Sequence, residues 1–235
     1  MARSPSRPRI SANDLALYMV SSDTARMGII RRAAEPQTFV TTRYKDVRAP
    51  IRAFLSDMAR CGNPLIEAAS MFEQRADDPS ESDLRKDDAR QSIEVINALR
   101  DMDNLLSGFN FQQAPNSHPK LEISGVEISV RADLWAIGER RGVEQVGGAI
   151  LRMTQDDAET PTAIARRREM GVYVATLLRM HLDQNNPTDR MPANRLCMSI
   201  DVRHGQVFTA PNSNTRRMND IEAACRVIQA LWGQA

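Results

Sequence analysis

The sequence predicts an α/β (α+β) protein with a mixed central sheet of about five strands, flanking helices and a helical N-terminal half. Three observations support this fold class. Apolar residues recur at helical spacing up to about residue 108, a strict alternation begins at Val126, and strand-like and helix-like segments then follow one another to the C-terminus. The predicted regions are a flexible basic arm (1–10), a helical region (11–108) and an α/β core (119–235).

The composition is that of an ordinary globular domain. Of the 235 residues, 42% are hydrophobic, which is enough for a sizeable core. With 31 basic and 30 acidic side chains the net charge is +1, which excludes a strongly basic coat protein but allows a local basic patch. The three cysteines are scattered and no apolar run is long enough to span a bilayer, so we expect a cytoplasmic protein with reduced thiols and no membrane contact.

Helical segments account for the first half of the chain. Ser11 or Asn13 is a suitable N-cap for the first helix, which we expect to begin at Asp14. Glycine, asparagine and proline at 62–64 indicate the end of one helix and the start of the next. The predicted helices cover about residues 14–30, 45–60, 64–75 and 84–107.

Strand signals begin after a polar loop. Apolar residues at every second position from Val126 to Ala136 predict one half-buried strand, and Glu139-Arg140-Arg141-Gly142 predicts a turn into the next. A helix and two further strands follow, and a terminal helix ends the chain. The predicted strands cover about 121–123, 126–137, 143–153, 195–202 and 206–210, and the helices about 160–183 and 217–232.

Carboxylates near the predicted hairpin are the first candidate site. If the turn is centred on Arg140, Asp133 lies roughly opposite Val146, and Glu144 projects from the same face two residues away. Two carboxylates so placed are suited to hold Mg²⁺ or Mn²⁺, which prefer oxygen ligands. A solvated face of an antiparallel sheet explains the same polar residues equally well.

Several segments together resemble the RecB-like branch of the PD-(D/E)XK nuclease superfamily. ISANDLALY (10–18) is similar to the opening helix of that branch. LEISGVEISVRADLWAI (121–137) resembles the hairpin that delivers its first metal-binding aspartate, here Asp133. ARRREMGVYVATLL (165–178) resembles the following helix, with Tyr173 matching and Glu169 replacing the usual glutamine. The resemblance implies a mixed sheet and, in an active enzyme, Mg²⁺- or Mn²⁺-dependent phosphodiester hydrolysis.

The chain departs from this family where catalysis would need it. The family's acidic-x-lysine element is expected within Val146–Leu151, which reads VGGAIL and carries neither residue, and no lysine follows Lys120. Arg152 is a poor substitute because its planar guanidinium stays protonated. Serines 21 and 22 stand where some members carry cluster-binding cysteines, so no iron–sulfur cluster and no other cofactor is expected.

Three functions therefore stay open. The leading hypothesis is a nuclease-fold protein with an eroded site that binds DNA, or a protein partner in a DNA-processing or defence assembly. The second is an active metal-dependent nuclease that uses the carboxylates of Asp133 and Glu144, with Glu122 as a further candidate, and Arg152 in the role of the lysine. The third is a structural interaction protein unrelated to nucleases. The sequence leaves the oligomeric state open.

Candidate nucleic-acid contacts come from two segments. Arg131 lies on the polar face of the predicted strand 126–137, and a basic run followed by a tyrosine lies in the predicted helix 160–183. A basic run early in a helix is also typical of a solvated face. The predicted contacts are Arg131, Arg166, Arg167, Arg168 and Tyr173.

Overall fold

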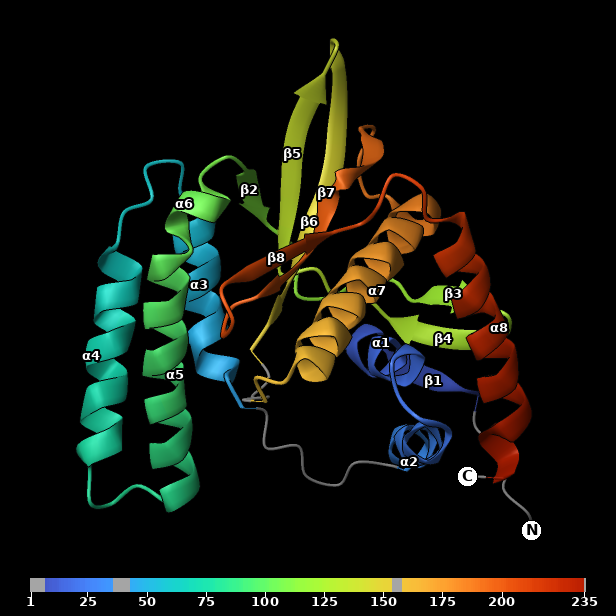
Figure 1. The fold of residues 1–235 in the computed structure, drawn as a ribbon. Coiled ribbons are helices and arrows are strands. Elements are labelled where there is room, and N and C mark those ends of the chain that lie inside the picture. The colour runs from blue at the N-terminus through green and yellow to red at the C-terminus, as the bar shows by residue number, and fades with distance from the viewer. Residues whose placement is uncertain (1–6, 36–42, 154–157, 235) are drawn as a thin grey trace.

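The arrangement of helices around a five-stranded sheet confirms the predicted mixed α/β class. The computed structural model describes residues 7–35, 43–153 and 158–234. Helices α3 to α6 lie on one side of the five-stranded sheet, and α7 crosses its other side (Figure 1). A second, three-stranded sheet lies beyond α7 together with α1, α2 and α8.

Most elements follow the predicted order, with shifts of a few residues at their ends. The helix expected over 14–30 is two helices (Ala12–Met19 and Asp23–Ala34), the helix expected over 84–107 is also two (Asp83–Asp101 and Asp103–Leu106), and Asn110–Gln113 form a strand where a polar loop was expected. The helices are α1 (Ala12–Met19), α2 (Asp23–Ala34), α3 (Lys45–Ser56), α4 (Asn63–Asp77), α5 (Asp83–Asp101), α6 (Asp103–Leu106), α7 (Pro161–Asn185) and α8 (Thr215–Leu231). The strands are β1 (Arg9–Ser11), β2 (Asn110–Gln113), β3 (Leu121–Ile123), β4 (Val126–Ser129), β5 (Leu134–Arg140), β6 (Val143–Arg152), β7 (Met191–Asp201) and β8 (Gln206–Thr209). Ser11 caps α1, because its hydroxyl accepts a hydrogen bond from the Asp14 amide.

The five-stranded sheet has the order β2-β5-β6-β7-β8. β5 and β6 form an antiparallel hairpin whose two turn residues, Arg141 and Gly142, have φ of 54° and 76°. Two positive φ values in a two-residue loop match the right-handed twist of the flanking strands. The long helix α7 then connects β6 to the parallel strand β7, and β8 returns antiparallel to β7.

The single strand expected over 126–137 is divided between the two sheets. β4 pairs with β1 and β3 in the three-stranded sheet, whereas β5 belongs to the five-stranded sheet. The apolar positions Val130 and Ala132 between them are buried, so the alternation continues through the bend. Alternation reports which residues face the interior, and it does not report which sheet holds the strand. The expectation of one strand was therefore wrong, although its buried positions were correct.

Part of the basic arm expected over residues 1–10 belongs to a strand instead. Arg9–Ser11 form β1, which pairs in parallel with β4, and the Glu127 amide donates to the Pro8 carbonyl at 2.9 Å. Residues 1–6 lie outside the described parts of the chain. The first strand therefore fixes the start of α1 against the three-stranded sheet.

Two hydrophobic clusters hold the layers together, and they divide the N-terminal helices between them. The first contains residues of α1 and α2 packed against the inner face of α7, such as Leu15, Ile30 and Val174. The second contains residues of α3 to α6 packed on the other face of the sheet, such as Ile51 and Phe72. Each fully buried side chain of this size contributes about 1.5–3 kcal/mol. None of the helices in the described ranges is long and apolar enough to cross a membrane.

Candidate functional site

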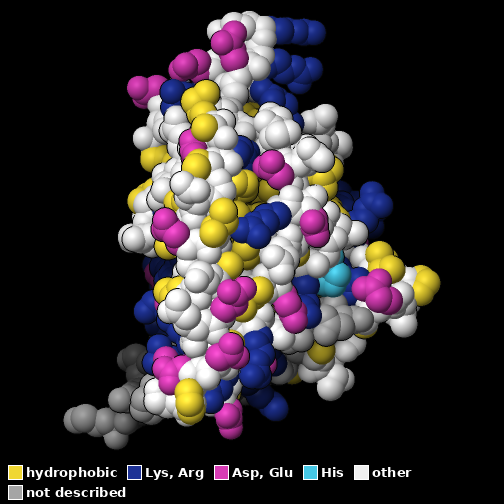
Figure 2. Space-filling view, turned by 90° about the vertical axis from the view of Figure 1, so that its left-hand side faces the viewer, with side chains coloured by type: hydrophobic (Ala, Val, Ile, Leu, Met, Phe, Trp, Pro, Cys, Tyr) yellow, Lys and Arg dark blue, Asp and Glu magenta, His cyan; other side chains and the backbone are white. Residues whose placement is uncertain are grey.

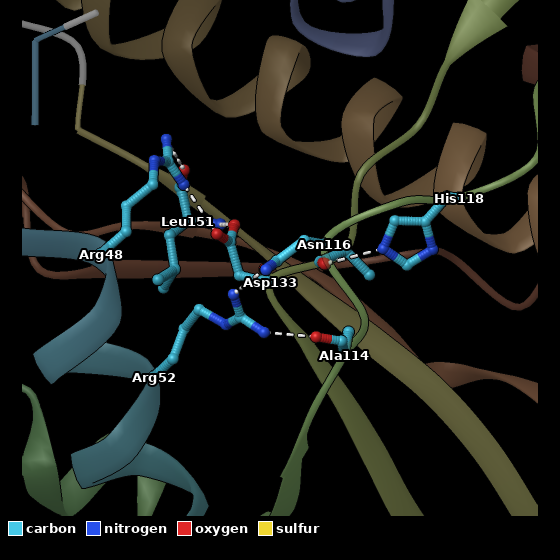
Figure 3. A network of polar contacts seen from close by, with 8 residues as sticks. Arg48, Arg52, Ala114, Asn116, His118, Asp133 and Leu151 are labelled. Atoms are coloured by element: carbon cyan, nitrogen blue, oxygen red, sulfur yellow. Dashed lines mark hydrogen bonds and ion pairs between the residues drawn. The ribbon is translucent and has the colours of Figure 1, made fainter. Parts of the chain in front are cut away.

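Asp133 lies immediately before β5 and has both carboxylate oxygens engaged (Figure 3). Its side chain is 11% exposed. Oδ1 accepts a hydrogen bond from Nη1 of Arg48 at 2.8 Å, and Oδ2 accepts one from the Leu151 amide at 2.8 Å. Its own amide donates to the Ala149 carbonyl at 2.8 Å. The carboxylate is thus held between a guanidinium and the main chain of β6.

Helix α3 supplies the cation that faces Asp133. Its apolar face, which includes Val47 and Ile51, packs on the sheet, and this packing places Arg48 beside the start of β5 and the end of β6. Nη2 of Arg48 also donates to the Leu151 carbonyl at 3.2 Å. One turn further along, Arg52 donates to Oδ1 of Asn116 at 2.8 Å and to the Ala114 carbonyl. Two arginines on one flank of α3 therefore fasten it to the segments that border Asp133.

The hairpin register separates Glu144 from Asp133. The turn falls at 141–142 instead of at Arg140, so Val146 pairs with Ile137, and the expected pairing of Val146 with Asp133 was wrong. Glu144 pairs with Glu139 near the tip of the hairpin, where its side chain forms an ion pair with Arg190 at 3.5 Å. Asp133 instead lies beside Ala149 and Leu151. Six residues of extended strand correspond to roughly 20 Å, so the two carboxylates do not share a site.

Arg152, the third predicted catalytic residue, lies inside the protein on the α7 side of the sheet. Its side chain is 5% exposed, and Nη2 lies 3.4 Å from the sulfur of Met170. Nη1 lies 3.7 Å from Oδ2 of Asp201. The other oxygen of Asp201, Oδ1, lies 2.8 Å from Nδ1 of His204. Burial lowers the pKa of Arg152, although the charge of Asp201 opposes this effect. The structure does not bring Arg152 and Asp133 together.

The side chains around Asp133 do not fit a divalent cation. Within the described ranges, no group of three or more histidine, cysteine, aspartate or glutamate side chains is arranged to hold a metal ion. A hard cation such as Mg²⁺ needs several oxygen ligands, and usually more than one carboxylate when the protein supplies them. Here the charged partner of Asp133 is the Arg48 guanidinium, which already supplies the positive charge.

A cleft of about 900 Å³ opens next to this ion pair. We call it the basic cleft, because basic side chains outnumber acidic ones along its walls. The basic residues are Arg9, Arg32, Lys45, Arg48, Lys120 and Arg131, and the acidic residues are Asp14, Glu35, Glu127 and Asp133. They come from β1, α1, α2, α3, β4 and from residues just outside α2, β3, β4 and β5. Ile150 and Leu151 of β6 also line the cleft, so it is bordered by both sheets.

Most of the acidic side chains in the basic cleft already have partners. Asp14 accepts a hydrogen bond from the Ser11 hydroxyl at 2.6 Å, Glu127 pairs with Arg7 at 2.8 Å, and Asp133 pairs with Arg48. Four of the basic side chains, by contrast, form no hydrogen bond or ion pair within the described parts of the chain: Arg9, Arg32, Lys45 and Arg131. The cleft therefore presents unbalanced positive charge to whatever enters it.

The remaining predicted nucleic-acid contacts lie elsewhere. Arg167 is 6% exposed and donates to the Ala158 carbonyl at 2.6 Å, whereas Arg166 and Arg168 are exposed on α7. The Tyr173 ring is half-buried beneath the guanidinium of Arg217, 5.5 Å from the ring centre, and burial raises the pKa of Tyr173. Of the five predicted contacts, Arg131 is the one that lines the basic cleft.

Sequence reasoning missed most of the cations in the basic cleft. Lys45, Arg48 and Arg52 are spaced by three and four residues, which places them on one flank of a helix. That spacing was a usable signal for a basic helix flank. No comparable local pattern marks Arg9 or Arg32, because the fold brings them to the cleft from separate elements.

Comparisons with known proteins add no relatives: no family model and no curated protein matches this chain.

Proposed function

We propose that this protein binds nucleic acid through the basic cleft and does not cut it. The observation that carries the proposal is the set of four unpartnered cations, Arg9, Arg32, Lys45 and Arg131, which reach one cleft from four separate segments of the described chain. Phosphate contacts from lysine and arginine provide most of the affinity in sequence-independent nucleic-acid binding. On the face over α4 and α5, by contrast, basic and acidic side chains are interspersed (Figure 2).

The order of the sheet supports kinship with RecB-like PD-(D/E)XK nucleases as part of this proposal. An antiparallel hairpin (β5–β6), a crossover helix (α7) and a parallel strand (β7) are consistent with the mixed sheet that the resemblance implies. In this kinship Asp133 would correspond to the family's first metal-binding aspartate, and its partner here is Arg48. The neighbouring part of β6 offers glycine and apolar side chains where a second carboxylate and a lysine would be needed.

Salt-dependent binding is the direct test of the proposed function. Fluorescence anisotropy with labelled single-stranded and duplex DNA and RNA should detect complexes whose affinity falls steeply between about 50 and 200 mM salt. The slope of log affinity against log salt should correspond to several phosphate contacts. Absence of binding to all of these probes at low salt, or binding that salt leaves unchanged, would refute the proposal.

Reversing one charge in the basic cleft should weaken binding about tenfold, which corresponds to about 1.4 kcal/mol. The Arg32→Glu variant is suited to this test, because the side chain is exposed and forms no hydrogen bond or ion pair within the described residues. Arg100→Glu on α5 is the matched control, since Arg100 is exposed but does not line the cleft. Equal losses in the two variants would show that net charge, and not the cleft, determines the affinity.

Supercoiled, linear and single-stranded DNA should stay intact when incubated with the protein and Mg²⁺ or Mn²⁺. The reason is that Arg48 neutralises Asp133 and that Glu144 is roughly 20 Å away by strand length. The measurement is product formation on denaturing gels over a range of protein concentrations. Cleavage that Asp133→Ala abolishes would identify an active nuclease and overturn the non-cutting part of the proposal.

A further inference from the structure

Arg48 is held in place by two acceptors that are themselves fixed. Its guanidinium donates to Oδ1 of Asp133 at 2.8 Å and to the Leu151 carbonyl at 3.2 Å. The same residue of β6 donates its amide to the other oxygen of Asp133 at 2.8 Å. Arg48, Asp133 and the main chain of Leu151 thus form a closed ring of three hydrogen bonds (Figure 3). Because one corner of this ring is the backbone of a central strand, the guanidinium has a defined orientation.

The ring leaves part of the guanidinium available to a ligand. A guanidinium has five N–H donors, and two of them are used in the contacts with Asp133 and Leu151. The Arg48 side chain is 36% exposed and lines the basic cleft. Lys45, one turn earlier on α3, and Arg131, two residues before Asp133, line the same cleft without partners of their own among the described residues.

We propose that Asp133 is a positioning residue, which holds Arg48 in the orientation that binds a phosphodiester group in the basic cleft. This inference rests on the proposed function. An arginine loses much side-chain freedom when it binds a phosphate, and a carboxylate that fixes it beforehand lowers that cost. The paired Arg48 also differs from the four unpartnered cations, since its charge is balanced and its contribution comes from directed hydrogen bonds.

The direction in which Asp133→Asn changes the binding affinity separates a positioning role from a simple electrostatic effect. Asp133→Asn removes a negative charge from a cleft that binds a polyanion, so if Asp133 were only a neighbouring charge the affinity should rise. If Asp133 positions Arg48, the same substitution should lower the affinity, because the ion pair that orients the guanidinium is lost. The asparagine keeps the size of the side chain and an oxygen that can accept from the Leu151 amide.

The experiment is a double-mutant cycle with a labelled oligothymidylate as the probe. We expect Asp133→Asn to weaken binding about fivefold in the wild-type background and to cause no loss in the Arg48→Gln background. Arg48→Lys keeps the charge but lacks the planar fork, so it should also lose about fivefold. Thermal unfolding of each variant shows whether it is folded. If Asp133→Asn does not fold, Arg48→Lys tests the same geometry.

The outcomes distinguish this inference from the proposed function. If wild-type protein shows no salt-dependent binding, the proposed function fails and the positioning role fails with it. If wild-type protein binds but Asp133→Asn binds as tightly or more tightly, the proposed function stands and the positioning role is wrong. The positioning role is also wrong if Asp133→Asn weakens binding equally in the wild-type and Arg48→Gln backgrounds, because the loss would then not depend on Arg48.

Discussion

Replacing Gly147 with alanine is expected to lower the free energy of unfolding by about 3 kcal/mol, near the upper end of the usual cost of overpacking a core. A Cβ atom at this position would collide with the carbonyl carbon and oxygen of Leu196 and with its Cβ. Gly147 lies where the register between β6 and β7 shifts, between the pairs of Val146 with Pro192 and of Gly148 with Cys197. The obstacle is the main chain of a buried strand, so it cannot turn aside as a flexible side chain could.

Urea or thermal unfolding measures this loss. For a chain of this size, 3 kcal/mol corresponds to a fall in Tm of roughly 6–12 °C. Gly108→Ala is the matched control, because no heavy atom beyond the two adjacent residues lies within 4 Å of the point that an alanine Cβ would occupy, and its φ is not positive. That variant should unfold within about 0.5 kcal/mol of the wild type. Similar losses at both positions would mean that the contact with Leu196 is not the cause.

Close packing accounts for the two glycines of the segment VGGAIL. From the sequence alone, this segment is noticeable only because it lacks a carboxylate and a lysine. In the structure, Gly147 allows β7 to approach β6 closely, and the Gly148 position faces the Leu134 carbonyl and the Trp135 ring. The segment therefore meets a packing requirement at the place where the resemblance predicted an acidic-x-lysine element.

Local signals were sufficient for the core of the fold. The strand over 143–153, the long helix after it and the terminal helix were all predicted within a few residues, because each combines regular periodicity with clear end signals. The strand over 126–137 was not predicted correctly, since its division depends on pairing with Arg9–Ser11, more than a hundred residues earlier. No local pattern reports such a pairing.

The candidate site was predictable only in part, for two physical reasons. The hairpin register follows from the turn, and the glycine at position 142 was the available signal for a turn at 141–142, which places Asp133 beside the end of β6. The partner of Asp133 could not be predicted, because Arg48 lies 85 residues earlier, on a helix that only the tertiary fold brings beside the start of β5. Asp133 could be selected from the sequence, but its neutralising arginine could not.

Acidification should destabilise the protein through His181, which lies on α7 with 1% of its surface exposed. Burial, together with the charge of the nearby His118, whose ring centre lies 6.0 Å away, lowers the pKa of His181 from an ordinary value of 6.5 to about 4. Because the folded protein resists protonation more than the unfolded chain does, the neutral form stabilises the fold above pH 6.5. This stabilisation is lost progressively as the pH falls from about 6.5 towards 4.

When the pH falls from 7.5 to 5, protonation of His181 alone should lower the free energy of unfolding by about 2 kcal/mol. Urea unfolding of the wild type and of His181→Leu at the two pH values isolates its contribution, because carboxylates and the other histidines titrate in both proteins. We expect the wild type to lose about 2 kcal/mol more than the variant does over this interval, whatever the variant's stability at pH 7.5. Parallel pH dependences would contradict this, and would mean that the imidazole at position 181 is protonated as easily in the folded protein as in the unfolded chain.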